Sequence, residues 1–308
     1  MTTPGKPKLI SAHDVGFSIG IPFLAATAWL TPERHWFFLA RKVAPYAGSV
    51  VSRSQDDIID CIEKTANGWN LAQAPESIAR ELVTAEIARN FQCMRDHLPW
   101  RWRPNIELVG REHLDAALAE GRGAILWDSH FSYAFVVTKM ALARAGFDLV
   151  HLSHPRHGHS STRFGMRFLN PFQTITETRY LKERLVMSLD GSAAALRTLI
   201  KRLKSNAVVS ITVRGAGQAP CQVPFMAGQL KIATGAPDLA YKCGAALIPV
   251  FTALKEDGRF RVTAEQPIAV QTGLSRQDAS EAAAKAYAER LEPYVARYPG
   301  QWVGWLNI

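Results

Sequence analysis

The stretch Gly123-Ala124-Ile125-Leu126-Trp127-Asp128-Ser129-His130 decides the architecture of this chain, because it joins an apolar run to a titratable side chain. A short apolar run after a glycine, here residues 124–128, is typical of a strand buried on both faces. Residues 132–145 have the composition of a helix, which Gly146 is placed to end. His130 is therefore expected at a strand-to-helix turn, where open α/β sheets carry their chemistry. A hydrogen-bonded structural histidine is the alternative, and the turn favours catalysis.

Short apolar segments alternate with helical ones from residue 105 onward. Further strands are predicted at 106–109, 147–152, 207–212 and 246–252. This alternation predicts an α/β fold with a mainly parallel, mixed sheet flanked by helices. Near the end of the chain, Ser275 with Asp278 indicates a helix start, and Pro299-Gly300 indicates its end.

The first hundred residues are predicted to be helical, with apolar residues at helical spacing in 55–70 and 75–96. The segment Trp100-Arg101-Trp102-Arg103-Pro104 has the composition of an exposed linker. We therefore expect two parts, a helical segment over 1–100 that associates with a membrane and an α/β core over 101–308.

The longest uncharged run is 15–30, between Lys8 and Glu33. Ala26-Thr27-Ala28 resembles a signal-peptide cleavage site. A spanning helix is disfavoured, because the run is shorter than the roughly 20 apolar residues that a bilayer needs. A helix lying in the membrane interface fits best, and an ordinary buried helix is the next alternative.

Composition restricts the class of protein. Hydrophobic residues make up 47% and charged residues 20% of the 308 residues, which excludes a disordered chain. The net charge of +9 predicts attraction to a polyanion, such as nucleic acid, an anionic membrane, an acidic carrier protein or a phosphorylated substrate. The four cysteines lack metal-ligand spacing, so reduced thiols are expected.

Three stretches together resemble one family. They are IELVGREHLDAALAEGRGAILWDSH (106–130), CQVPFMAGQLKIATGAPDLAYKCGAALIPVF (221–251) and YPGQWVGWLNI (298–308). Their order and spacing resemble bacterial lipid A late acyltransferases, within the lysophospholipid acyltransferase superfamily. The resemblance implies a glycerolipid acyltransferase-like fold. It also implies acyl transfer from acyl carrier protein (ACP) or coenzyme A (CoA) to a membrane lipid, at the cytoplasmic face of the inner membrane, by a peripheral or monotopic protein.

The family motif is a histidine followed, after four residues, by an aspartate or glutamate. Here His130 is followed by Phe135 at the acidic position. The resemblance implies that His130 is the general base, while the orienting carboxylate is missing. Asp128, two residues earlier on the same side of an extended segment, is the expected replacement, and a helix cap is its alternative role. An easily activated acceptor such as an amine, or a relative without catalysis, would also explain Phe135.

Several residues are expected to bind substrate. Guanidinium groups of Arg156, Arg163 and Arg167 suit phosphate. Arg214 stands where the family carries an acidic residue, next to a glycine turn suited to an oxyanion. Gly228 belongs to the Val-Pro-Phe-x-x-Gly element, and Thr234 and Gly235 open a helix whose N–H groups suit an anion. For both turns, ordinary turn chemistry is the alternative.

Four histidines, at 151, 154, 157 and 159, lie in the same stretch of the sequence as Arg156, Arg163 and Arg167. A metal site is one interpretation, but no cysteine or clear carboxylate accompanies them, so a solvated loop is favoured and no metal is predicted.

The sequence therefore predicts a membrane-associated acyltransferase that needs no metal or organic cofactor. Its expected partners are an acyl-ACP or acyl-CoA donor, a lipid or small-molecule acceptor with a hydroxyl or amine, and a membrane surface. The alternatives are a non-catalytic lipid-binding relative and an acyl-thioester hydrolase. Nucleic-acid binding is not expected, because no binding motif is present.

Overall fold

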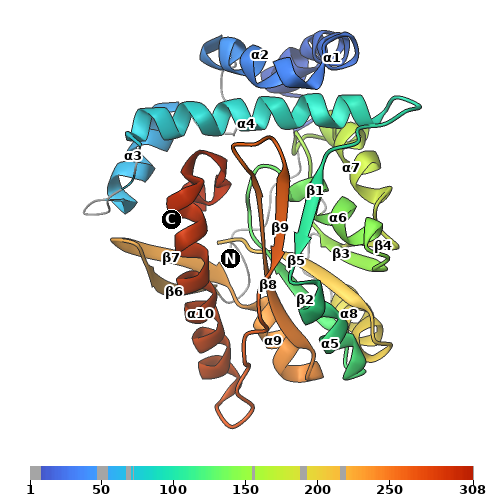
Figure 1. Cartoon of the computed structure of the whole chain (residues 1–308), viewed down its shortest axis with the longest axis vertical. Helices are drawn as coiled ribbons and strands as arrows, with labels where there is room; N and C mark the ends of the chain where they lie inside the picture. The colour runs from blue at the N-terminus through green and yellow to red at the C-terminus, as the bar shows by residue number, and fades with distance from the viewer. Residues whose placement is uncertain are drawn as a thin grey trace.

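A seven-stranded sheet forms the centre of the molecule (Figure 1). The computed structural model describes residues 8–46, 55–66, 71, 73–154, 157–187, 193–215 and 220–307. The strand order is β1-β9-β8-β2-β5-β3-β4, and β8 and β9 form the antiparallel pair. The strands are β1 Ile106–Val109, β2 Ala124–Asp128, β3 Leu149–Ser153, β4 Glu183–Val186, β5 Val208–Thr212, β8 Ala246–Leu254 and β9 Phe260–Ala264. The α/β class and the mainly parallel sheet predicted from the sequence are confirmed.

Helices cover the sheet. The N-terminal ones are α1 Ala12–Leu30, α2 Trp36–Val43, α3 Gln55–Thr65 and α4 Pro75–Asp96. Those of the α/β part are α5 Arg111–Ala119, α6 Ala134–Arg144, α7 Asn170–Thr178, α8 Ala193–Lys204, α9 Gly235–Cys243 and α10 Arg276–Arg297. A π-helical turn, Gly165–Leu169, precedes α7. An antiparallel hairpin of β6 Pro220–Phe225 and β7 Gly228–Ala233 lies outside the main sheet. The sequence did not predict this hairpin, β4 or β9.

Strand β2 is buried on both faces, which explains its continuous apolar sequence. Ile125 and Trp127 belong to one apolar cluster, in which the Trp127 ring lies 4.5 Å from that of Tyr287 on α10. Ala124 and Leu126 belong to a second cluster, with residues of α4 and α6. Because side chains alternate along a strand, a single apolar run supplies both cores.

Helix α4 joins the N-terminal helices α1 and α2 to the sheet, and Asp14 of α1 also accepts a hydrogen bond from Thr162 at 2.7 Å. In Figure 1, α4 lies across one end of the sheet, with α1 and α2 on its outer side. The indole N–H of Trp29 donates to the Met94 carbonyl at 2.8 Å, and Arg95 Nε donates to the Ala28 carbonyl at 2.6 Å. Residues of these helices and of the sheet share the second apolar cluster.

The segment that follows α4 is only partly exposed, contrary to the linker predicted from its composition. Trp102 is buried, and its indole N–H donates to Glu33 Oε1 at 2.9 Å. The ring also packs edge-on against Phe260, with centroids 5.5 Å apart. The tryptophan therefore attaches this segment to both the N-terminal helices and the sheet.

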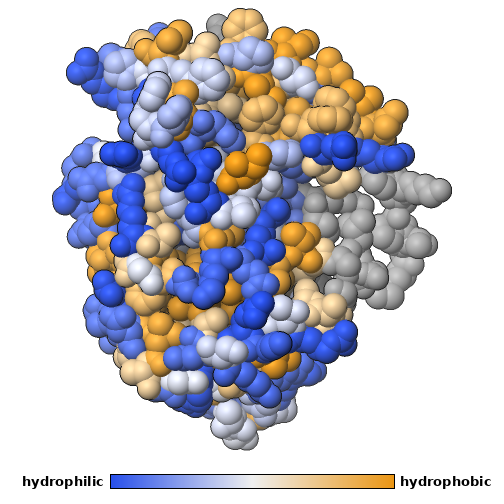
Figure 2. All heavy atoms as spheres, turned by 90° about the vertical axis from the view of Figure 1, so that its right-hand side faces the viewer, coloured by the Kyte–Doolittle hydropathy of each residue, from blue (hydrophilic) through white to orange (hydrophobic). Residues whose placement is uncertain are grey.

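Large apolar side chains remain exposed on the outer side of α1 and α2, and Figure 2 shows apolar residues gathered at that end of the molecule. Phe23 is 72% and Leu30 83% exposed. We call this set the N-terminal apolar surface: Val15, Ile19, Phe23, Trp29, Leu30, Phe37, Phe38 and Val43. Within the described ranges, no helix is long and apolar enough to cross a bilayer.

Candidate active site

The turn that carries His130 is fixed by backbone hydrogen bonds from both neighbouring strands. Ser129 N–H donates to the Val250 carbonyl of β8 at 2.9 Å, and Val213 N–H donates to the Asp128 carbonyl at 2.8 Å. His130 therefore lies at the carboxyl edge of the parallel strands, as the sequence predicted.

The C-terminal segment holds the same turn from the other side. Val303 N–H donates to the His130 carbonyl at 2.9 Å, and Ser132 N–H donates to the Gln301 carbonyl at 2.8 Å. The Gln301 side-chain amide also pairs with both backbone groups of Leu254, at the end of β8. The segment that contains Gln301 and Trp302 therefore holds the histidine turn in place through backbone hydrogen bonds.

Several polar atoms around this turn are buried without a hydrogen-bond partner in the described part of the chain. They are Asp128 Oδ1, Ser129 Oγ, His130 Nδ1, Ser132 Oγ and Tyr133 OH. Leaving a buried polar group unpaired costs about 1–3 kcal/mol. Such a concentration at one turn is typical of a site whose partners arrive with a ligand or with water.

The His130 imidazole is neutral at physiological pH. Burial is the main cause that lowers its pKa to about 3, and the charges of Arg214, Arg89 and His157 contribute to the same fall. A neutral imidazole has a lone pair with which to accept a proton. The same surroundings disfavour the imidazolium that would result.

Asp128 Oδ1 and His130 Nδ1 are both buried without a hydrogen-bond partner in the described structure, and the Asp128 carboxylate is hydrogen-bonded to Thr138 instead. The contact required of an orienting carboxylate is therefore not formed. Burial raises the Asp128 pKa to about 7, although Lys139 opposes the rise. The alternative role as a helix cap is wrong. Helix α6 begins at Ala134 without a side-chain cap, because residues 131–133 form a turn paired with the C-terminal segment.

Phe135 occupies the family's acidic position and lies among cationic side chains. Its ring centroid is 5.4 Å from the Arg89 guanidinium and 5.6 Å from Lys139 Nζ. The His157 ring is 6.0 Å away. An aromatic ring stabilises a desolvated cation by about 2 kcal/mol or more, but it is uncharged and cannot accept the N–H of an imidazole as a carboxylate does.

Arg214 and the start of α9 are brought together. Arg214 follows β5, and its carbonyl accepts from Ala233 N–H at 2.8 Å, directly before Thr234 and Gly235. A Cβ built on Gly235 would meet no atom within 4 Å, so the first turn of α9 is open. Gly228 starts β7 near Thr65 of α3, in the hairpin.

The expected phosphate-binding arginines are not among the groups that act on His130. Arg163 and Arg167 are exposed near the π-helical turn, and Arg163 N–H donates to the Lys8 carbonyl at 2.9 Å. Arg156 lies outside the described residues. The sequence reasoning missed Arg89, a cation of α4 next to the site.

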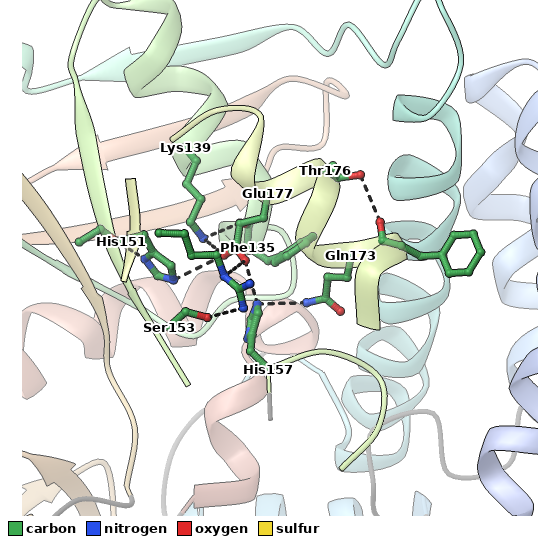
Figure 3. A network of polar contacts seen from close by, with 11 residues as sticks. Phe135, Lys139, His151, Ser153, His157, Gln173, Thr176 and Glu177 are labelled. Carbon is green, nitrogen blue, oxygen red and sulfur yellow. Dashed lines mark hydrogen bonds and ion pairs between the residues drawn. The ribbon is translucent and has the colours of Figure 1, made fainter. Parts of the chain in front are cut away.

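Three of the four histidines are buried or half-buried, contrary to that interpretation, whereas His154 is exposed directly after β3. His151 is a buried residue of β3, and His159 stacks on Phe17 with ring centroids 4.3 Å apart. His157 is 16% exposed and lies 3.1 Å from the buried carboxylate of Glu177, shown in Figure 3. Within the described residues, no group of three potential ligands is arranged to hold a metal ion.

Lys139 and Glu177 also escaped the sequence reasoning. Lys139 Nζ lies 2.5 Å from Glu177 Oε1, and both side chains are buried (Figure 3). A lone lysine in the otherwise apolar run of α6 was the signal that a buried acid would accompany it.

The sequence model of one protein family, the bacterial lipid A biosynthesis acyltransferases, matches residues 3–307 of this chain. The chain belongs to this family. No curated protein matches it closely enough to serve as a relative. The matched region contains His130, Phe135 five residues after it, and the Gln301-Trp302 pair.

Proposed function

We propose that this protein transfers a fatty acyl group from a thioester, acyl-ACP or acyl-CoA, to a hydroxyl or amine acceptor. The observation that carries the proposal is a neutral His130 at the carboxyl edge of the sheet, among unpartnered buried polar atoms. Family membership supports the reaction class.

His130 is the proposed general base. It takes the proton of the acceptor as the oxygen or nitrogen attacks the thioester carbonyl carbon. The attack moves negative charge onto the carbonyl oxygen, and a nearby cation stabilises that charge. Arg214 suits this role, because its charge already acts on His130 and its backbone adjoins the open start of α9. Thr234 and Gly235 would present N–H groups to the same oxygen or to a phosphate.

The acceptor is proposed to approach from a membrane. The N-terminal apolar surface and the net charge of +9 suit an anionic lipid surface, and no spanning helix is found among the described residues. We propose peripheral or monotopic attachment to the cytoplasmic face of the inner membrane.

The experiment compares wild type with His130→Ala, using His113→Ala on α5 as the control. Purified protein receives acyl-CoA or acyl-ACP thioesters with a series of saturated chains, together with a total lipid extract. Free thiol is measured with a thiol-reactive dye, and acylated products by mass spectrometry. We expect a loss of at least about a hundredfold in kcat for His130→Ala, and near-normal kcat for His113→Ala. Full activity of His130→Ala would refute the mechanism.

The same assay separates two alternatives. Phe135 and the cationic surroundings of His130 favour a non-catalytic lipid-binding relative, which would release no thiol but retain acyl chains. Thiol release at the same rate with and without acceptor, with free fatty acid as the product, would identify a thioester hydrolase.

A further inference from the structure

The carboxylate of Glu177, on a different helix, lies near the Phe135 side chain. Glu177 lies on α7, is fully buried, and places Oε1 2.5 Å from Lys139 Nζ and Oε2 3.1 Å from His157 Nε2. Lys139 and His157 are also neighbours of the Phe135 ring. The ring and the carboxylate therefore share two partners. The family's acidic group is absent at 135, but a negative charge is supplied beside it.

A buried ion pair with Lys139 does not account for all of this arrangement. Lys139 is satisfied by Glu177 and by the Phe135 carbonyl, 2.7 Å away. The same carboxylate also faces two imidazoles and a guanidinium: His157, His151 at 3.4 Å and Arg184 at 3.9 Å. Of the two imidazoles, His151 is buried in the sheet, whereas His157 is partly open to solvent. His157 is therefore the imidazole of this network that a substrate or a proton can reach.

His157 also belongs to the surroundings of His130. Its ring lies 6.0 Å from that of Phe135, the residue at the position where the motif after His130 has its carboxylate. His157 and Arg214 also act on the His130 pKa. The two histidines differ in their partners. His130 Nδ1 is buried without a hydrogen-bond partner, and the charged groups that act on His130 are cationic. His157 Nε2 lies 3.1 Å from the Glu177 carboxylate and 3.5 Å from the Gln173 amide nitrogen (Figure 3).

We propose that the His157–Glu177 pair replaces the carboxylate missing at position 135. This inference rests on the proposed function. The acceptor's oxygen or nitrogen bonds to the thioester carbonyl carbon and gives its proton to His130. The proton passes on to His157, where Glu177 stabilises the imidazolium. The C–S bond breaks, and the departing thiolate takes the proton to become a thiol.

The electrostatic reason is the difference between the two imidazoles. A proton on His130 is opposed by burial and by the charges of Arg214 and Arg89. Burial lowers the pKa of His157 below its ordinary value, and contact with Glu177 opposes this fall. Titratable groups face His157 from several elements: Glu177 of α7, Lys139 of α6, His151 of β3, His159 of the same loop, His130 after β2 and Arg214 after β5. Glu177 is the one acid among these groups, so it favours a proton on His157.

The test compares His157→Gln with His159→Gln. The two histidines lie in the same loop, but His159 stacks on Phe17 instead of facing Glu177. We expect kcat for thiol release from lauroyl-CoA or lauroyl-ACP to fall at least about tenfold in His157→Gln, with unchanged KM, and to stay within about twofold in His159→Gln. Adding Phe135→Glu to His157→Gln should restore activity, because a carboxylate then stands at the family position.

Wild type and His130→Ala are assayed in parallel. A wild type with His130-dependent transfer, combined with full kcat in His157→Gln, would overturn this inference and leave the proposed function intact. Absence of transfer by the wild type would overturn both. Equal losses in the two glutamine variants would also refute the relay.

Nitrogen-15 spectra of the wild-type histidines provide a measurement that does not depend on a folded variant. His157 should carry its proton on Nε2, the nitrogen next to Glu177, which leaves Nδ1 free to accept. A neutral His157 protonated on Nδ1 would contradict the assignment.

Discussion

Asp128→Asn tests whether the aspartate beside the active histidine is an ionised orienter or a buried acid that is easily protonated. Burial raises the Asp128 pKa from 3.8 to about 7. Because one pH unit of pKa difference corresponds to about 1.4 kcal/mol, the folded state disfavours the ionised form by about 4 kcal/mol. Asparagine has nearly the same shape and no charge to bury.

The sign follows from linkage. The folded protein holds the Asp128 proton more tightly than the unfolded chain, so its stabilising contribution is complete below about pH 4 and is lost as the pH rises through 7. Asparagine does not titrate. The free energy of unfolding of Asp128→Asn, relative to wild type, should therefore rise by about 3 kcal/mol between pH 5 and pH 8.

Urea denaturation of both proteins at several pH values measures this difference. Asp148→Asn is the control, because it removes an aspartate from the exposed surface. The kcat of Asp128→Asn should also stay within about threefold of wild type, whereas losing an orienting carboxylate costs about 10⁴. A stability difference that is flat or falls with pH, together with a large loss of kcat, would show that Asp128 is ionised and supports His130.

Two further predictions concern surfaces. Changing Phe23 and Phe38 of the N-terminal apolar surface to glutamate should reduce sedimentation with phosphatidylglycerol vesicles at least about tenfold, since apolar contact is replaced by repulsion. The control, Val109→Glu at an exposed apolar position on β1, should sediment like wild type. Equal binding by all three proteins would exclude this surface as the attachment site. Changing Arg163 and Arg167 to glutamine should raise KM about tenfold for a phosphorylated acceptor, because two charge-assisted contacts are lost, and should leave KM for a neutral acceptor unchanged. Equal changes in both KM values would assign the arginines a structural role.

The sequence by itself determined the elements whose pattern is local. Strand β2 and helix α4 have the predicted bounds, because a doubly buried strand is continuously apolar and a helix start at Pro75 follows from the fixed φ of proline. The order of apolar segments also determined the α/β class and placed His130 at the edge of the sheet. The hairpin of β6 and β7 escaped prediction, because its apolar and polar positions depend on packing against α3 and α10.

Only the tertiary structure decided which charges meet at the site. Glu177 lies 38 positions after Lys139 along the chain, and no spacing rule connects two residues on different helices. Arg89 reaches Phe135 from α4, and His157 meets Glu177 across the sheet edge. For Asp128, the sequence suggested a contact that the structure does not form. Its position two residues before His130 suggested a contact, but the packing that buries it determines where its carboxylate points and which protonation state it prefers.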